Sequence, residues 1–462
     1  MNLTLSRLLA ARAHTEPGQT ALVVHGRSTL TFGDWTRRAD TVAAGLLARG
    51  LRPGDRVGLR FSAAEWGDYA VAFMGVLRAG AVAVPLSDRS TPADLDGLLR
   101  DCRAAGLLHG AGPLPGAGPY EGGWPLAETT ATPTDLPDVR PGAPAQILYT
   151  PGAEGVLATH AGLAHGLGGG RRPFPHSRHL AHAFPIGTGA GQSMLTAAVD
   201  ARPAVVTLPR FTPGRFAALI ETYRAGTVFV VPSMAVELLD AGVHDRHDLS
   251  SVLLLGSVAA PLPGPIARRL TRAFPSAAIT NYYASAQAAA VQTIMLFDPE
   301  RPGSVGRAVA GGGVRVTAPD GTPAAPGETG EVWTRTPACD RWVRMGDLGH
   351  LDEEGYLFLV DRDGDVVESG AFKVSTLRVE AVVHTHPAVA EAAVVGVPHP
   401  VLGRVLAAVV VTREPLSAAD LRLFLKDRLA PHELPAHVRT VEALPRGRGG
   451  KVDKRQLMGA FR

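Results

Sequence analysis

The chain has 462 residues, a formal net charge of +3 and two cysteines, Cys102 and Cys339. This length favours two or more lobes, and so small a charge on so long a chain argues against a nucleic-acid-binding surface. The cysteines lack metal-ligand or redox spacing, and the N-terminal residues lack the basic-then-apolar layout of a signal peptide. No apolar run reaches the roughly 18 residues of a membrane span. We therefore expect a soluble cytoplasmic protein without nucleic-acid or membrane partners.

The N-terminal region alternates helical and strand patterns. Residues 31–34, Thr-Phe-Gly-Asp, have the form of a capping box that opens a helix. Residues 57–61 alternate as a half-buried strand, a helix passes through Met74, and residues 81–85 form a short apolar strand. This alternation predicts an α/β architecture with largely parallel sheets.

The middle of the chain begins with a long connection and then returns to the same alternation. Residues 109–144 are rich in Gly, Pro and Thr without a period, which is typical of a surface connection. Strands are predicted over residues 203–208, 227–231 and 252–255, and a helix over residues 216–223.

The pattern changes after Asp347. A strand over residues 356–360 leads into a polar joint at 361–365, and a compact α+β pattern follows. The sequence therefore predicts an α/β protein with two domains. Residues 1–361 form a large N-terminal lobe of packed, mostly parallel sheets and helices, and residues 362–462 form a small mobile α+β C-terminal domain.

The C-terminal domain carries a conspicuous lysine. Lys451 follows a glycine-rich turn, and it is one of only four lysines in the chain. A lysine ammonium is a compact charge on a flexible stem, suited to reach a phosphate or a carboxylate. On a small mobile domain it can be moved into and out of a site by hinge motion. A solvated charge cluster is the alternative for this stretch alone.

Several motifs, taken in order, resemble those of the adenylate-forming superfamily, which includes acyl-CoA synthetases, luciferases and peptide-synthetase adenylation domains. Residues 77–85 resemble the family's second motif, and Met345–Leu348 its TGD motif. Residues 365–380 resemble the start of its C-terminal domain, and residues 386–398 are very similar to the sequence pattern of the family in that domain. The resemblance covers nearly the whole chain.

This resemblance implies a reaction in two halves. A small carboxylic acid attacks the α-phosphate of Mg-ATP, which gives an acyl-adenylate and pyrophosphate. The small lobe then rotates, and a thiol or an amine takes the acyl group. By the same resemblance Asp347 and Arg362 contact the ATP ribose, and Lys451 bridges the carboxylate and the α-phosphate. The thiol belongs to CoA or to the phosphopantetheine of an acyl-carrier protein.

The resemblance also implies further site residues. Those near the nucleotide are Tyr149, Thr150, Gly152, Gly155, Gly256, Tyr283, Ala284 and Gln287. Gln287 lies where the family has its Mg²⁺-binding glutamate. A second catalytic candidate is His160, for which a structural role is the equal alternative. Those near the acyl group are Phe184, Gly187, Gly191 and Tyr282, and the small residues around them leave room for a bulky or aromatic group.

The nucleotide motifs also depart from the family pattern. The phosphate loop lacks four residues of that pattern, among them its lysine, and Glu154 replaces a small hydroxyl residue. A carboxylate that faces a triphosphate repels it. Ala286 replaces the phosphate-binding threonine, and Gln287 keeps an oxygen without the charge that a hard cation prefers.

Three hypotheses follow. The first is an adenylate-forming ligase that uses ATP to transfer a small carboxylic acid to CoA, a carrier-protein thiol or an amine. The second is a non-adenylating enzyme on the same scaffold, acting on a preformed acyl-thioester by cyclisation or acyl transfer. The third is a catalytically inactive member of the family. Nucleotide dependence separates the first from the others.

Overall fold

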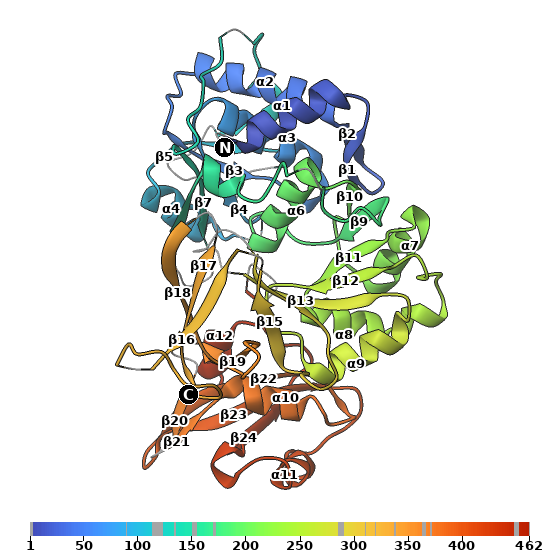
Figure 1. Cartoon of the computed structure of the whole chain (residues 1–462), viewed down its shortest axis with the longest axis vertical. Helices are drawn as coiled ribbons and strands as arrows, with labels where there is room; N and C mark the ends of the chain where they lie inside the picture. Colours follow the sequence, from blue (N-terminus) through green and yellow to red (C-terminus); the bar gives the residue numbers. More distant parts are fainter. Residues whose placement is uncertain are drawn as a thin grey trace. The chain divides into compact units, whose positions relative to one another are not determined.

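The computed structural model describes residues 3–88, 90–112, 123–133, 135–149, 155–169, 172–284, 291–309, 311–318, 320–336, 339–362, 366–369, 372–447 and 452–461. It divides into two compact units (Figure 1). Unit 1 comprises Met1–Phe229 with His247–Leu253, and unit 2 comprises Val230–Arg246 with Leu254–Arg462. The predicted domain boundary at residues 361 and 362 stays a prediction. In the described part of the chain, no helix has both the length and the apolar character needed to cross a membrane.

Unit 1 contains a six-stranded sheet. In spatial order its strands are β6 (Trp124–Pro125), β5 (Ala104–His109), β3 (Arg56–Arg60), β4 (Val82–Leu86), β7 (Pro144–Tyr149) and β8 (Gly155–Thr159). All neighbouring pairs are parallel except β7 and β8. The prediction of a half-buried strand at residues 57–61 is wrong, because Val57, Gly58 and Leu59 are all buried. A central parallel strand is covered on both faces. The predicted connection at 109–144 contains the short strand β6.

A second group of strands in unit 1 is also mainly parallel. Its order is β11 (Thr227–Val230), β9 (His179–His182), β10 (Ala204–Thr207), β1 (Thr20–Val24) and β2 (Ser28–Thr31), with only β1 and β2 antiparallel. The helices are α1 (Leu5–Thr15), α2 (Phe32–Ala48), α3 (Trp66–Arg78), α4 (Pro92–Asp101), α5 (His160–Leu163), α6 (Gly189–Asp200) and α7 (Pro213–Tyr223). The predicted cap of α2 is confirmed, since Thr31 Oγ1 accepts a hydrogen bond from Asp34 N at 3.1 Å.

The first part of unit 2 is mainly antiparallel. Its strands run in the order β16 (Gly313–Thr317), β17 (Gly330–Thr336), β18 (Cys339–Leu351), β19 (Leu357–Arg362), β15 (Ser304–Ala308), β14 (Val291–Leu296), β13 (Ala278–Ala284) and β12 (Leu254–Ser257). Only β12 and β13 are parallel neighbours. The helices α8 (Pro232–Asp240) and α9 (Gly264–Ala273) belong to the same unit. The strand expected at residues 252–255 begins two residues later, at Leu254.

The C-terminal part of unit 2 has its own sheet. Its strands are β21 (Phe372–Val374), β20 (Val367–Ser369), β23 (Gly403–Thr412) and β22 (Val389–His399), with β24 (His437–Thr440) paired to β23. Its helices are α10 (Thr376–Val383), α11 (Ala418–Lys426) and α12 (Lys454–Gly459). Two apolar clusters cover the two faces of this sheet, one containing Val394 and the other Val395. The α/β class, with a smaller α+β C-terminal part, is confirmed.

Candidate active site

A buried tyrosine and a buried aspartate meet in unit 2. Tyr283 lies on β13 and Asp347 on β18, and each side chain is 9% exposed. The Tyr283 hydroxyl donates a hydrogen bond to Asp347 Oδ2 at 2.5 Å. A buried carboxylate needs hydrogen-bond donors, and the lone pairs of its two oxygens can accept more than one hydrogen bond. This site is therefore suited to accept hydrogen bonds from the hydroxyl groups of a ligand.

Arg362 lies directly opposite Asp347. The two residues are cross-strand partners in the antiparallel pair of β18 and β19. Directly opposite residues of two antiparallel strands are nearest neighbours across the sheet. The backbone register therefore brings together the two residues that the resemblance assigns to the ribose, although they are fifteen positions apart in the sequence.

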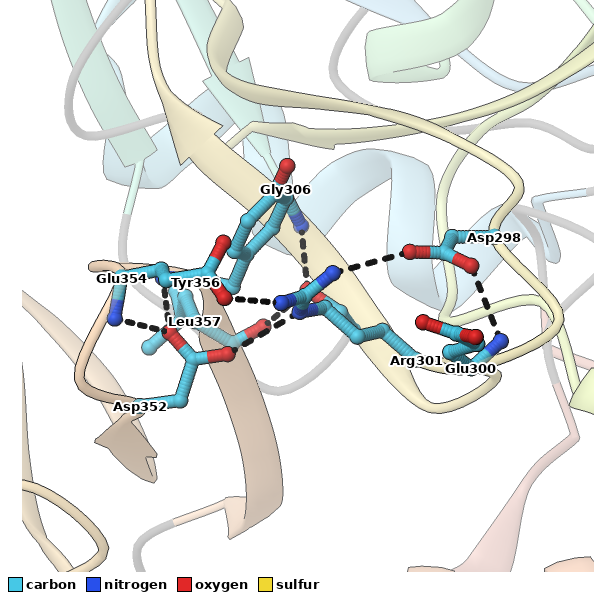
Figure 2. A network of polar contacts seen from close by, with 9 residues as sticks. Asp298, Glu300, Arg301, Gly306, Asp352, Glu354, Tyr356 and Leu357 are labelled. Carbon is cyan, nitrogen blue, oxygen red and sulfur yellow. Dashed lines mark hydrogen bonds and ion pairs between the residues drawn. The ribbon is translucent and has the colours of Figure 1, made fainter.

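A polar cluster around Arg301 fixes the turn between these two strands (Figure 2). Arg301 Nη1 lies 3.0 Å from Asp298 Oδ2 and its Nε 3.3 Å from Asp352 Oδ2, and Nη2 contacts Glu354. The guanidinium also lies 4.7 Å from the centre of the Tyr356 ring. Hydrogen bonding, first to Asp298, raises the pKa of Arg301. The segment before β15 is thereby tied to the turn that connects β18 to β19.

The end of β12 contains a buried hydroxyl group without a partner. Gly256 pairs with Thr280 of β13. The next residue, Ser257, is 0% exposed, and its Oγ has no hydrogen-bond partner among the described residues. Ala259 has a φ of 73°, in the left-handed region that is strained for a residue with a Cβ. An unpaired buried hydroxyl and a strained backbone are both typical of a ligand site. Only its neighbour Gly256 was predicted from the sequence.

The two tyrosines of β13 face opposite sides of the sheet. Successive side chains of a strand alternate between its faces, so Tyr282 points away from the face on which Tyr283 meets Asp347. Tyr282 is half-buried, and burial raises its pKa. Ala284 ends the strand. Gln287, the predicted metal ligand, lies outside the described residues.

In unit 1, the predicted acyl-site glycines are required by the backbone. Phe184 is 3% exposed, and its carbonyl accepts a hydrogen bond from Trp66 Nε1 at 3.2 Å. Gly187 has a φ of 82°, and a Cβ there would lie 2.8 Å from the Leu86 carbonyl carbon. A Cβ on Gly191 would lie 2.4 Å from the Pro185 carbonyl oxygen. These glycines allow the loop before α6 to pack closely.

A buried polar network beside this loop was missed by sequence reasoning. The Tyr69 hydroxyl donates to Gln192 Oε1 at 2.9 Å, and Gln146 Nε2 donates to the same oxygen at 3.1 Å. All three residues are buried, and burial raises the pKa of Tyr69. The available signal was Gln146, a polar residue within the apolar segment 145–148, because buried polar groups in such segments need partners.

Tyr149 and Gly155 frame the predicted phosphate loop. They are cross-strand partners at the loop end of the β7–β8 hairpin. The Tyr149 hydroxyl is hydrogen-bonded to Asp101, and burial together with this bond raises its pKa. Thr150, Gly152 and Glu154 lie outside the described residues. The hairpin therefore sets where the loop begins and ends.

His160 is the first residue of α5 and is 0% exposed. Neither ring nitrogen has a hydrogen-bond partner among the described residues, and burial lowers its pKa to about 4. The imidazole is therefore neutral near pH 7. This enclosed position agrees with the structural alternative, and the catalytic role of His160 stays a prediction.

Lys451 lies outside the described residues, but its surroundings are defined. Arg446 and Val452 form an isolated antiparallel bridge. Asp453 caps α12, because its side chain accepts hydrogen bonds from the backbone N–H groups of Arg455 and Gln456, each at 3.1 Å. The chain immediately after Lys451 is therefore anchored. Among the residues that the structure describes, no group of three or more His, Cys, Asp or Glu side chains could hold a metal ion.

Comparisons with known proteins agree over nearly the whole chain. A family model described as AMP-binding enzyme matches residues 9–341, and one described as AMP-binding enzyme C-terminal domain matches residues 378–451. A feruloyl-CoA synthase from an Amycolatopsis species is 30% identical, and the match covers 97% of each chain.

Solved structures share the fold. ATP-bound MatB from Rhodopseudomonas palustris has a TM-score of 0.86 at 25% identity, with 100% of this chain and 99% of that chain covered. An anthranilate CoA ligase, AuaEII, in complex with anthranoyl-AMP has a TM-score of 0.85 at 21% identity, with 99% and 97% covered. The similarity thus includes both the large lobe and the C-terminal domain.

Proposed function

We propose, since the chain belongs to the family of AMP-binding enzymes, that it activates a small carboxylic acid with ATP. The carboxylate displaces pyrophosphate from ATP and forms an acyl-adenylate. The thiol of CoA, or an amine, then displaces AMP and forms a thioester or an amide. The enzyme is thus an acid–thiol or acid–amine ligase of the AMP-forming type. ATP and CoA are available in the cytoplasm, which is the location that we propose.

The observation that carries this proposal is the buried Asp347. Its carboxylate accepts a hydrogen bond from Tyr283, and it lies opposite Arg362 in the strand register. A carboxylate has two acceptor oxygens, so it can accept hydrogen bonds from two neighbouring hydroxyl groups of a ribose. Because Asp347 is buried, these hydrogen bonds are shielded from water and are stronger than at the surface. Asp347 and Arg362 would therefore hold the ribose.

The phosphate groups and the metal require other residues. Backbone N–H groups of the loop that contains Thr150, Gly152 and Gly155 would contact the phosphates. We propose that Mg²⁺ would enter bound to the ATP phosphates and would keep several of its water ligands, and that Gln287 would offer it one amide oxygen. Lys451 would offset the negative charge that gathers between the carboxylate and the α-phosphate.

The nucleotide and the acyl group would each contact a separate set of the residues that the family resemblance assigns to the site. Gly256, Tyr283 and Ala284 would contact the nucleotide, as would Tyr149 at the start of the phosphate loop. Phe184, Gly187, Gly191 and Tyr282 would surround the acyl group. An aromatic acid is the substrate class we favour, because the similar feruloyl-CoA synthase is named for one. The acceptor thiol is that of CoA, and a carrier-protein phosphopantetheine is the alternative.

The test is ATP binding by calorimetry with Mg²⁺, beside ATP–pyrophosphate exchange over a panel of aromatic and aliphatic acids. We expect exchange with an aromatic acid, and its loss by about a hundredfold or more in Lys451→Ala, because a transition-state charge contact is removed. Lys426→Ala, at an exposed position of α11, is the control and should keep the activity.

Absence of both ATP binding and exchange would contradict this function. The shortened phosphate loop with Glu154, together with the changes at Ala286 and Gln287, favours the second candidate, an enzyme acting on a preformed acyl-thioester. Turnover of an acyl-CoA without ATP would identify it.

A further inference from the structure

A basic pocket lies in unit 2, and none of its lining residues belongs to the strands that carry the candidate nucleotide site. Its volume is about 440 Å³, a size typical of small-molecule sites. One wall is α9, and the other is the segment between the end of α10 and the start of β22. Figure 1 labels α9, α10 and β22. None of Asp347, Tyr283 and Ser257 lines this pocket. Its chemistry is therefore separate from that of the ribose site.

The pocket concentrates positive charge. Four arginines line it, Arg268, Arg269 and Arg272 from α9 and Arg413 after β23, and its described lining contains no carboxylate. The carboxylate of Asp240 lies beside the pocket and forms ion pairs with two of these arginines. Its Oδ1 is 2.6 Å from Arg269 Nη2, and its Oδ2 is 2.8 Å from Arg413 Nη2. Four guanidinium groups less one carboxylate leave a net charge of +3 at this place.

Two of the arginines are available for a ligand. Arg268 and Arg272 are one helical turn apart, so their side chains extend from the same face of α9. Both are exposed, and neither forms a hydrogen bond or an ion pair with any residue that the structure describes. Arginine is the residue best suited to bind phosphate, because its planar guanidinium donates two parallel hydrogen bonds.

The rest of the lining has room for an organic group. Pro265 and Pro387 contribute accessible apolar surface, and His386 packs edge-on against Phe424 with the ring centres 4.6 Å apart. His384 also lines the pocket, and burial and the charge of Arg413 lower its pKa to about 4. A neutral imidazole can donate or accept a hydrogen bond without adding charge.

We propose that this pocket binds a phosphorylated small molecule carrying two or more negative charges. The arginines supply the phosphate contacts, and the apolar and imidazole surfaces contact the organic part. Arginines from α9 and from the C-terminal sheet would bind the same ligand, so the occupied pocket holds these two elements together. The proposal does not depend on catalysis of adenylation.

The test is a site-resolved footprint with inorganic pyrophosphate as the probe. The full chain is treated with phenylglyoxal, which modifies arginines, and each peptide is quantified by mass spectrometry. We expect pyrophosphate to slow the modification of Arg268 and Arg272 about fivefold or more, relative to sodium chloride of equal ionic strength. Arg210 and Arg215, exposed on another part of the chain, should react at the same rate in both salts. Equal rates at Arg268 and Arg272 in both salts would overturn the proposal.

A double variant provides the second measurement. In Arg268→Ala with Arg272→Ala, the pyrophosphate concentration that half-protects Arg413 should rise about tenfold or more, since two phosphate contacts are lost. Arg210→Ala with Arg215→Ala removes the same charge elsewhere and should leave it unchanged. An equal rise in both double variants would indicate general charge attraction and reject the site. The footprint is measured at the pocket, so a failure of ATP–pyrophosphate exchange would not change its result. A failure of the footprint would likewise leave the result of the exchange experiment unchanged.

Discussion

The Tyr283 hydroxyl donates a hydrogen bond of 2.5 Å to Asp347 Oδ2, although the two residues are 64 positions apart in the chain. Asp347→Asn keeps the shape of the side chain but removes the charge. We expect the dissociation constant for ATP to rise about tenfold or more, because hydrogen bonds to a charged group contribute roughly 1.5–3 kcal/mol. Calorimetric titration of ATP measures this directly.

Tyr283→Phe tests whether the tyrosine acts through Asp347. This variant keeps the ring and the carboxylate, so its effect on ATP binding should be smaller than that of Asp347→Asn. Its unfolding temperature should fall, because the buried carboxylate loses a donor. Unchanged ATP affinity in Asp347→Asn, with the fold intact, would remove Asp347 from the ribose site.

Arg301 holds the turn between the strands that carry Asp347 and Arg362 (Figure 2). Arg301→Lys keeps one charge but cannot contact three carboxylates at once, because only the guanidinium has donors pointing in separate directions. We expect a lower unfolding temperature and weaker ATP binding together, since the turn supports the strand pair. Calorimetry and thermal unfolding measure the two effects. A loss of stability with unchanged ATP affinity would separate this cluster from the site.

Gly187 combines a positive φ with close backbone contact. In Gly187→Ala the new Cβ would lie 2.8 Å from the Leu86 carbonyl carbon, at a φ of 82°. We expect the free energy of unfolding to fall by roughly 2–4 kcal/mol, from backbone strain and from the clash. Gly166→Ala is the matched control, because its φ is 75° and no atom lies within 4 Å of its Cβ. It should cost only about 1 kcal/mol, and equal losses in the two variants would exclude the clash as a cause.

Burial of His160 makes stability depend on pH. Its pKa is lowered to about 4 in the folded chain, from 6.5. Between these values the unfolded chain binds a proton that the folded chain does not, so stability falls as the pH falls. The full contribution is present above pH 6.5 and is lost on approach to about pH 4.

His160→Leu removes this group and keeps a similar volume. The free energy of unfolding of the unchanged protein should fall between about pH 7 and pH 4. In His160→Leu we expect this fall to be smaller by roughly 2–3 kcal/mol. Urea unfolding at a series of pH values measures the difference between the two proteins. Equal pH dependence would mean that His160 does not stay neutral in the folded chain.

The fold was predictable where the local pattern and the tertiary environment agree. Thr31 caps a helix as expected, because a capping hydrogen bond involves only residues three positions apart. The face pattern of residues 57–61 failed, because burial on both sides depends on neighbours that are distant in the chain.

The candidate site was predictable where a motif names the residue. Asp347 and Arg362 were identified by motif, and the strand register then placed them opposite each other. Ser257 and the Tyr69–Gln192 pair could not be found in this way. Whether a lone hydroxyl or amide is buried and which partner it meets are properties of the tertiary structure.

Glu154 is the sequence feature that most opposes ATP binding. It replaces a small hydroxyl residue in the phosphate loop, where a carboxylate repels a triphosphate. In Glu154→Ser we expect ATP to bind about fivefold more tightly, which corresponds to roughly 1 kcal/mol for one partly screened charge. The gain should shrink as salt is added, because added ions screen the repulsion. Glu128→Ser, an exposed glutamate of unit 1, removes the same charge elsewhere and should leave ATP affinity unchanged. Weaker ATP binding in Glu154→Ser would mean that this carboxylate assists the nucleotide, through the metal or through a loop contact.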